Sequence, residues 1–329
     1  MAGRASIAGN ARAVQVDFGG MNAFLARCLY LTAFVLGRLP WPLLRGLADG
    51  VAALWRRLGA RESVVALRNL QLAHPDMPAD ERTRLQRAIL RTTARQALET
   101  LRLWTRPHAD NLRLIRETEG VDLFDAAIAA GKGVIVAAPH YGNWELLNQW
   151  LAAHTPLAIL YRPPDSALGE AFLRIVRADD VGRVTQIRAE AAGIRQLFKR
   201  LRDGGVVGIL PDQQPKRGDG EFAPFFGRPA YTMTLLPRLA ERSGATVVFA
   251  YCERIGDLAF ALRIEPAPAE IASPDTATAV AALNAAVERI ARRDPAQYQW
   301  TYKRYSLQPD WKNPYRDLEG DRHREGENG

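Results

Sequence analysis

The chain has 329 residues, enough for one large domain or two small ones. Hydrophobic residues make up 47% and charged residues 24%, which is typical of a chain with a packed core. The formal net charge of +8 indicates anionic partners, whether nucleic acid, anionic lipid or an acidic protein. The two cysteines, Cys28 and Cys252, are too few for a disulfide framework and match no zinc pattern, so we expect a cytosol-facing domain.

An apolar segment near the N-terminus predicts contact with a membrane. Its uninterrupted part lies between Arg27 and Arg38, shorter than the roughly 20 residues of a spanning helix. No small-residue cleavage site follows, which argues against a secretory signal. The first seventy residues hold nine arginines against three acidic residues, a bias that favours an anionic cytoplasmic leaflet. We expect a helix in the membrane interface, and the alternative is an ordinary amphipathic core helix.

The rest of the chain alternates between predicted helices and strands. Residues 79–104 follow two prolines and have helical spacing of apolar residues. Short β-branched or apolar runs then alternate with amphipathic segments. We expect strands at 133–139, 157–161, 206–210, 245–252 and 258–264, and helices at 144–153, 189–201, 235–242 and 275–292. This order predicts an α/β fold with a mixed, mostly parallel central sheet flanked by helices.

The segment from His140 to Glu145 carries the clearest chemical signal. It lies where a predicted strand ends and a helix begins, which is where α/β folds place ligands. Asn143 fits the N-cap of that helix, and Gly142 permits a tight turn. Glu145, in the first turn, could hold one nitrogen of His140 protonated and leave the other as a base. A structural histidine at a helix start is the alternative.

The residues around His140 limit the kind of reaction in which it could act as a base. No Ser or Cys nucleophile lies beside His140 in an elbow motif. A His and a Glu five residues apart match no standard zinc ligand pair, so no metal is expected. The remaining task for the base is to deprotonate an external hydroxyl that attacks an activated acyl group.

Several further segments resemble one known family. The His140-X4-Glu145 spacing is similar to the His-X4-Asp/Glu motif of glycerolipid acyltransferases, and the fuller pattern resembles the bacterial lipid A biosynthesis (lauroyl/myristoyl) acyltransferase family. The match covers most of the chain in the family's order. Its segments are Arg68-Asn69-Leu70 with His74-Pro75-Asp76, Tyr161-Arg162-Pro163, Pro211-Asp212-Gln213-Gln214, Phe225-Phe226-Gly227-Arg228-Pro229-Ala230, and the stretch from Pro295 to Tyr305.

This chain departs from the family pattern at three points. Ala296 stands where the family often has Glu, and Tyr305 where it often has Phe or Trp. The N-terminal apolar segment is weaker than the family's usual anchor, which concerns the mode of anchoring and leaves the chemistry unaffected.

The resemblance implies roles for individual residues. His140 is the expected general base and Glu145 its partner, with no metal or cofactor. The expected substrate contacts are Asn143, Arg162, Arg177 and Asp212, and Arg174 competes with Arg177 for its role. Arg162 suits a phosphate or carboxylate because a guanidinium presents a fork of donors.

The resemblance also implies substrates and location. The expected reaction moves a fatty acyl chain from acyl carrier protein to a hydroxyl of a lipid A precursor, Kdo-modified lipid IVA or its partly acylated product. Coenzyme A as donor, and another lipid or glycolipid as acceptor, remain open. The expected site is the cytoplasmic side of the bacterial inner membrane. Nucleic acid is excluded as a partner, since no helix-turn-helix, RNA-recognition or zinc-finger pattern occurs.

We expect three parts along the chain. Residues 1–58 form an N-terminal extension and membrane-associating helix, residues 59–313 the catalytic domain, and residues 314–329 a charged flexible tail.

Overall fold

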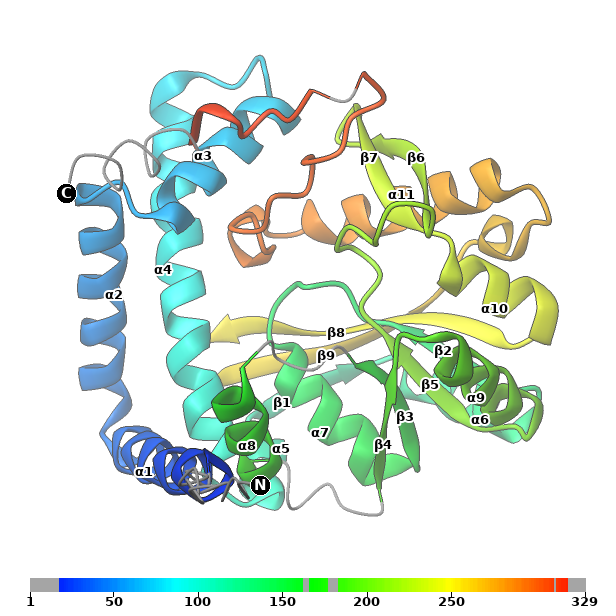
Figure 1. The fold of residues 1–329 in the computed structure, drawn as a ribbon, viewed down its shortest axis with the longest axis horizontal. Helices are drawn as coiled ribbons and strands as arrows, with labels where there is room; N and C mark the ends of the chain where they lie inside the picture. The colour runs from blue at the N-terminus through cyan, green and yellow to red at the C-terminus, as the bar shows by residue number, and fades with distance from the viewer. Residues whose placement is uncertain (1–17, 162–165, 177–182, 311, 319–329) are drawn as a thin grey trace, which may run out of the picture.

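A seven-stranded sheet forms the centre of the molecule (Figure 1). The computed structural model describes residues 18–161, 166–176, 183–310 and 312–318. The strand order is β1-β9-β8-β2-β5-β3-β4. Every neighbouring pair is parallel except β8 and β9. The bounds are β1 Ile115–Glu119, β2 Val134–Ala137, β3 Leu157–Tyr161, β4 Val184–Arg188, β5 Val206–Ile209, β8 Thr246–Gly256 and β9 Ala259–Pro266. The predicted mixed, mostly parallel sheet is confirmed.

Helices cover both faces of this sheet because its central strands are apolar on both sides. All four residues of β2 and of β5 are buried. Successive side chains alternate between two cores. One core includes α9, α10 and α11, the other α6 and α7. The bounds are α6 Val121–Ala129, α7 Trp144–His154, α9 Ala191–Arg202, α10 Leu235–Ser243 and α11 Thr276–Ala291.

The remaining elements lie outside the seven-stranded sheet and the helices described above. Helix α4 is the long predicted helix, and it has the expected bounds, Ala79–Trp104. A small antiparallel hairpin packs on α11. The other bounds are α3 Arg61–Ala73, α5 His108–Leu112, α8 Ala167–Val176, β6 Gly220–Phe225, β7 Arg228–Met233, η2 Ala269–Ala272 and η3 Pro295–Gln297.

Two N-terminal helices form one flank of the molecule. Helix α1 (Phe18–Arg38) contacts α4 and α8, and α2 (Trp41–Arg57) lies along α4 (Figure 1). By length and composition, residues 20–38 of α1 are long and apolar enough to cross a membrane, at about 1.5 Å per residue. Helix α1 begins at Phe18, so the apolar segment extends past Arg27 towards the N-terminus. It is therefore longer than the stretch between Arg27 and Arg38 that we compared with a spanning helix.

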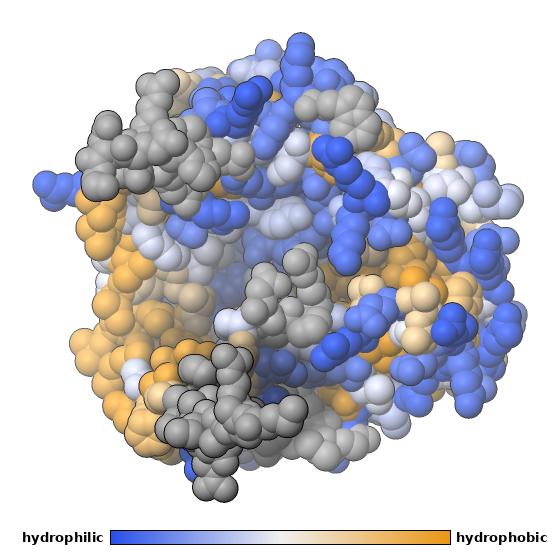
Figure 2. All heavy atoms as spheres, in the orientation of Figure 1, coloured by the Kyte–Doolittle hydropathy of each residue, from blue (hydrophilic) through white to orange (hydrophobic). Residues whose placement is uncertain are grey.

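The same flank carries an exposed apolar surface. Figure 2 shows hydrophobic residues gathered over α1 and α2, beside a hydrophilic hollow near the centre of the view. We call this surface the apolar flank. Its most exposed members are Met21, Phe24, Leu31, Val35, Leu43, Leu54 and Leu58.

The packed chain continues past residue 313, where we expected a tail to begin. Tyr315 is fully buried, and Leu318 packs against the core that lies under α3 and α11. The hydroxyl of Tyr315 donates to Oδ1 of Asn69 and accepts from the backbone N–H of Tyr305 at 3.2 Å. Residues 314–318 are thus part of the folded unit.

Replacing Tyr315 should measure this contribution. Tyr315→Ala removes a buried ring and should cost about 3–5 kcal/mol of unfolding free energy, whereas Tyr315→Phe loses only its hydrogen bonds, at about 1 kcal/mol. Urea unfolding of the wild type and both variants gives the order. Equal stability of wild type and Tyr315→Ala would contradict a packed role for this segment.

Candidate active site

The two central strands bring His140 and Asp212 side by side. Strands β2 and β5 are parallel neighbours, with Ala137 opposite Ile209. His140 and Asp212 each lie three residues beyond these partners, at the carboxyl edge of the sheet. Oδ1 of Asp212 is 2.8 Å from Nδ1 of His140, and Oδ2 accepts from the backbone N–H of His140 at 2.9 Å.

The surroundings keep this carboxylate ionised. Asp212 is 4% exposed and His140 9%. Burial by itself raises the pKa of Asp212, but His140 and Arg304 outweigh it and lower the pKa below its usual value. A carboxylate at Nδ1 favours a proton there and leaves Nε2 unprotonated, as a general base requires.

The opposite edge of the ring faces polar and aromatic groups. Nε2 of His140 lies 3.2 Å from the side-chain nitrogen of Gln213, which also donates to Oε1 of Gln299 at 3.1 Å. The ring of Trp144 meets the imidazole edge-on, with centroids 5.0 Å apart. With Nδ1 protonated, the Gln213 amide donates to Nε2.

Asn143 and Glu145, two further predicted site residues, both lie at the start of α7. Asn143 caps α7 as expected, because its side chain accepts from the backbone N–H of Leu146 at 3.1 Å. Glu145 lies in the first turn of α7, where Oε2 accepts from Nε1 of Trp104 at 3.1 Å. The carboxylate at Nδ1 of His140 belongs to Asp212, so the role of Glu145 stays a prediction.

The predicted arginines cannot be placed in the same way. Arg162 and Arg177 lie outside the described residues. Arg174, the competitor of Arg177, is on α8 and largely exposed, 3.8 Å from Glu170. Among the described residues, no group of three or more His, Cys, Asp or Glu side chains could hold a metal ion.

The loop after His140 is held on both sides by backbone hydrogen bonds. Gly142 has φ +63°, and a Cβ there would overlap the carbonyl oxygen of Cys252 on β8. Asn143 N–H donates to that carbonyl at 2.8 Å. On the other side, Gly142 N–H donates to Gln297 O at 3.2 Å, and His140 O accepts from Gln299 N–H at 3.0 Å. The segment around residues 297–299 therefore helps to form the site.

A buried ion pair that the sequence analysis missed also supports this loop. Glu99 on α4 is 1% exposed and accepts from both Nε and Nη2 of Arg254 on β8. Its Oε2 also accepts from the side chain of Asn143 at 3.1 Å. The pair thus links α4, β8 and the cap of α7. No motif connects two residues 155 positions apart, so only the structure could reveal it.

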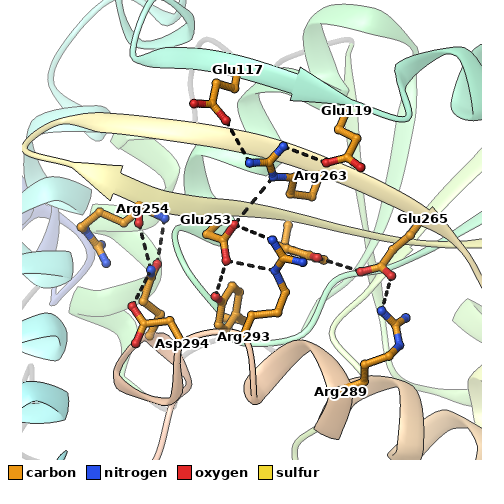
Figure 3. A network of polar contacts seen from close by, with 12 residues as sticks. Glu117, Glu119, Glu253, Arg254, Arg263, Glu265, Arg289, Arg293 and Asp294 are labelled. Atoms are coloured by element: carbon orange, nitrogen blue, oxygen red, sulfur yellow. Dashed lines mark hydrogen bonds and ion pairs between the residues drawn. The ribbon is translucent and has the colours of Figure 1, made fainter.

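A second charged network holds the residue next to His140 (Figure 3). Glu253 accepts from the Tyr141 hydroxyl at 2.7 Å and from Arg293 through two bonds of 3.0 Å. Burial raises the pKa of Glu253, but Arg293 and Tyr141 outweigh it and lower the pKa. Arg263 extends the network to Glu117 and Glu119 on β1. Ion pairs through Arg263 and Glu253 therefore connect strand β1 to Tyr141 in the loop that carries His140.

Removing Glu99 should destabilise the protein far more than removing Asp49 of α2, a carboxylate that also pairs with an arginine. Glu99→Ala leaves Arg254 buried without its partner and should cost about 3–5 kcal/mol. The matched control is Asp49→Ala, which breaks a bidentate pair with Arg95 of α4 that is more exposed and should cost about 1 kcal/mol or less. Urea unfolding measures both, and equal losses would contradict the buried role of Glu99.

Comparison with known proteins identifies the family. The model of the family described as bacterial lipid A biosynthesis acyltransferase matches residues 22–306. The chain belongs to this family. It is an acyltransferase with a family match that covers the sheet, the His140 loop and the closing segment.

Curated relatives share most of their length with this acyltransferase. It is similar to the lipid A biosynthesis palmitoleoyltransferase of Escherichia coli K12, 29% identical over 87% of this chain and 94% of the relative. It is similar to the lipid A biosynthesis lauroyltransferase of the same strain, 26% identical over 83% and 88%. A phosphatidylinositol mannoside acyltransferase of Mycobacterium tuberculosis (strain CDC 1551 / Oshkosh) is 28% identical over 83% and 84%.

Proposed function

We propose that this acyltransferase moves a fatty acyl chain from acyl carrier protein to a hydroxyl of a lipid A precursor. The observation that carries the reaction is the His140–Asp212 pair, buried at the carboxyl edge of the sheet, with Nε2 of His140 turned away from Asp212 so that an acceptor hydroxyl can take the place of the Gln213 amide. The family and the two relatives named for lipid A biosynthesis support the acceptor.

The reaction runs as proton transfer coupled to acyl transfer. Nε2 of His140 takes the proton of the acceptor hydroxyl, and the oxygen attacks the thioester carbonyl. The resulting imidazolium is stabilised by the Asp212 carboxylate at Nδ1. The tetrahedral intermediate expels the carrier thiolate, which takes the proton from His140. The products are an ester and the free thiol of the carrier. Glu145 keeps its predicted role as a further support of the imidazolium.

Substitution of the pair tests the mechanism. His140→Ala should abolish transfer, and Asp212→Asn should lower kcat about 10²–10⁴-fold, because a neutral amide no longer fixes the tautomer or stabilises the imidazolium. His154→Ala is the control, since that ring stacks on Trp150 at the far end of α7. Initial rates with acyl carrier protein thioester give kcat. Near-wild-type activity of a folded His140→Ala variant would contradict the proposed mechanism.

The acceptor needs its own experiment. The relative named for phosphatidylinositol mannoside acylation favours a second candidate, a different glycolipid acceptor with the same chemistry. Purified enzyme offered acyl carrier protein thioester with either Kdo-modified lipid IVA or a phosphatidylinositol mannoside would separate the two by mass spectrometry of the products. Acylation of the mannoside alone would favour the second candidate.

We also propose that the apolar flank docks the enzyme on the cytoplasmic face of the inner membrane. Most of the large exposed apolar side chains of the described residues lie on α1 and α2 or at the end of α2. Helix α1 packs its other side on α4 and α8, with Ala26 and Ala33 buried, so it lies along the protein. Arg38, Arg56 and Arg57 at the ends of these helices suit anionic headgroups.

Charges placed in the apolar flank should weaken membrane binding. The double variant Leu31→Glu, Val35→Glu should lower sedimentation with anionic phospholipid vesicles roughly 10-fold or more, because it removes two side chains from the bilayer and adds repulsion. Leu123→Glu on α6 is the control, being an exposed leucine outside the flank. Equal vesicle binding by the double variant and wild type would refute docking by this surface.

A further inference from the structure

The four backbone N–H groups of residues 140–143, in the loop that carries the base, are all engaged. They donate to Asp212, Pro139, Gln297 and Cys252. The proposed acyl transfer puts negative charge on the former carbonyl oxygen of the thioester. Acyl-transfer enzymes stabilise this oxyanion with hydrogen-bond donors that are fixed in advance, often backbone N–H groups beside the catalytic residues. In this loop the backbone cannot serve, so a donor is needed from another segment.

The side chain of Gln213 brings a donor to the base. Its nitrogen lies 3.2 Å from Nε2 of His140 and donates to Oε1 of Gln299 at 3.1 Å. Asp212 holds the imidazole proton on Nδ1, so Nε2 accepts, and the amide faces it with an N–H and not with its oxygen. Both hydrogens of the amide are therefore assigned, one to His140 and one to Gln299.

Binding of the acceptor frees one of these two hydrogens. The lone pair of Nε2 accepts one hydrogen bond, so an acceptor hydroxyl that donates to Nε2 displaces the N–H of Gln213. The other N–H stays on Gln299, which keeps the amide nitrogen beside the base. The displaced N–H therefore lacks an acceptor from the moment at which the hydroxyl is in place.

Proton transfer keeps this N–H available during the reaction. Once His140 has taken the proton of the hydroxyl, Nε2 carries a hydrogen and can no longer accept from Gln213. The attacking oxygen and the oxyanion are bonded to the same carbon, so the oxyanion forms next to the position from which the amide was displaced. Negative charge therefore develops where a donor has just lost its partner.

The two glutamines are held in place by their own backbones and neighbours. The backbone N–H of Gln299 donates to the carbonyl of His140 at 3.0 Å, and its carbonyl accepts from the N–H of Tyr302 at 3.2 Å. On the other segment, the N–H of Gln214, next to Gln213, donates to the Tyr302 hydroxyl at 2.9 Å. The amide is thus oriented before the substrates arrive, which is the condition under which a donor stabilises a transition state most effectively.

We propose that Gln213 is a catalytic residue that donates a hydrogen bond to the oxyanion, and that Gln299 is a positioning residue that aligns its amide. The assignment rests on the proposed function, because it takes His140 as the base. In the free enzyme the amide occupies Nε2, and the arriving hydroxyl converts it into a donor for the oxyanion. This bond forms in the transition state and not with the bound substrates, so it raises kcat without tightening substrate binding.

Replacing Gln213 by methionine keeps the length of the side chain and removes both N–H donors. Gln213→Met should lower kcat about 10²–10³-fold and leave KM for Kdo-modified lipid IVA unchanged or lower, because the amide no longer competes for Nε2. Gln308→Met is the matched control, since Gln308 is also half-buried and its amide donates to the backbone carbonyls of Pro229 and Tyr305. Initial rates with acyl carrier protein thioester give both constants.

A donor substrate with sulfur in place of the carbonyl oxygen separates an oxyanion contact from a general loss of structure. Sulfur is a weak hydrogen-bond acceptor, so a dithioester gains little from the N–H of Gln213. The ratio of kcat for the thioester to kcat for the dithioester of the same acyl chain on acyl carrier protein should fall about 10-fold or more in Gln213→Met. It should keep the wild-type value in Gln308→Met.

The positioning role of Gln299 is tested by a double variant. Gln299→Leu removes the oxygen that anchors the amide and should lower kcat about 10-fold, less than the loss of the donor itself. Because Gln299 acts through Gln213, the combination of Gln213→Met and Gln299→Leu should be no slower than Gln213→Met alone. A separate structural effect of Gln299 would lower kcat further in the double variant.

The outcomes distinguish these roles from the proposed function. An unchanged thioester-to-dithioester ratio in an active Gln213→Met enzyme would overturn the role of Gln213. A raised KM for the acceptor at unchanged kcat would also overturn it, because the amide would then bind the acceptor in the ground state. Additive losses in the double variant would overturn the role of Gln299. Every one of these results requires an active wild-type enzyme, whereas a wild type that transfers no acyl chain to Kdo-modified lipid IVA would overturn the proposed function and the role of Gln213 with it.

Discussion

The parallel, in-register pairing of β2 and β5 is the constraint on which the site depends. It places the residues that follow both strands at the same level beyond the carboxyl edge of the sheet. His140 and Asp212 therefore meet although no local motif connects them. Both strands are buried on both faces, which fixes their register through packing. A shift of register by one residue would separate the base from its carboxylate and also reverse the faces of four buried side chains.

Around this pairing, two ion pairs hold the loop that carries the base; the Glu99–Arg254 pair is buried, whereas Arg293 of the second pair is exposed. Glu99 and Arg254 clamp the cap of α7 from one side, and Glu253 and Arg293 hold Tyr141 from the other. Buried ion pairs are costly to desolvate and are weak evidence of stability in themselves. Their value here is geometric, because each pair joins elements from different parts of the chain and leaves the His140 loop few alternative conformations.

Local signals in the sequence were sufficient for part of this structure. The start of α7 was predictable because a buried strand, a glycine and an N-cap asparagine follow one another within ten residues. The limits of α4 and β3 were predictable from apolar spacing and length. Edge strands β1 and β4 were missed because their sequences, Ile-Arg-Glu-Thr-Glu and Val-Thr-Gln-Ile-Arg, are polar and mostly exposed. The hairpin β6–β7 contains Pro224 and Pro229, which argue against strands in any sequence-based prediction.

The site was only partly predictable for a different reason. Spacing along the chain suggested Glu145 as the partner of His140, because residues near a helix start are neighbours. The carboxylate at Nδ1 belongs to Asp212, three residues beyond the neighbouring strand β5, and strand order is a property of the whole fold. The role of Glu145 stays a prediction. Asp212 was placed at the site through a resemblance, but its contact with the imidazole could not be inferred from sequence. The same holds for Glu99, whose partner is 155 residues away.

The position of Asn69 has a consequence for how the protein is made. This buried side chain on α3 donates to the carbonyls of Trp300 and Tyr302 at 2.6 and 2.7 Å and accepts from Tyr315. All three partners belong to the last thirty residues of the 329. During synthesis, α1 and α2 leave the ribosome long before these partners exist. The helices of the apolar flank are therefore available to a membrane while the segment around Gln299 that completes the site has yet to be translated.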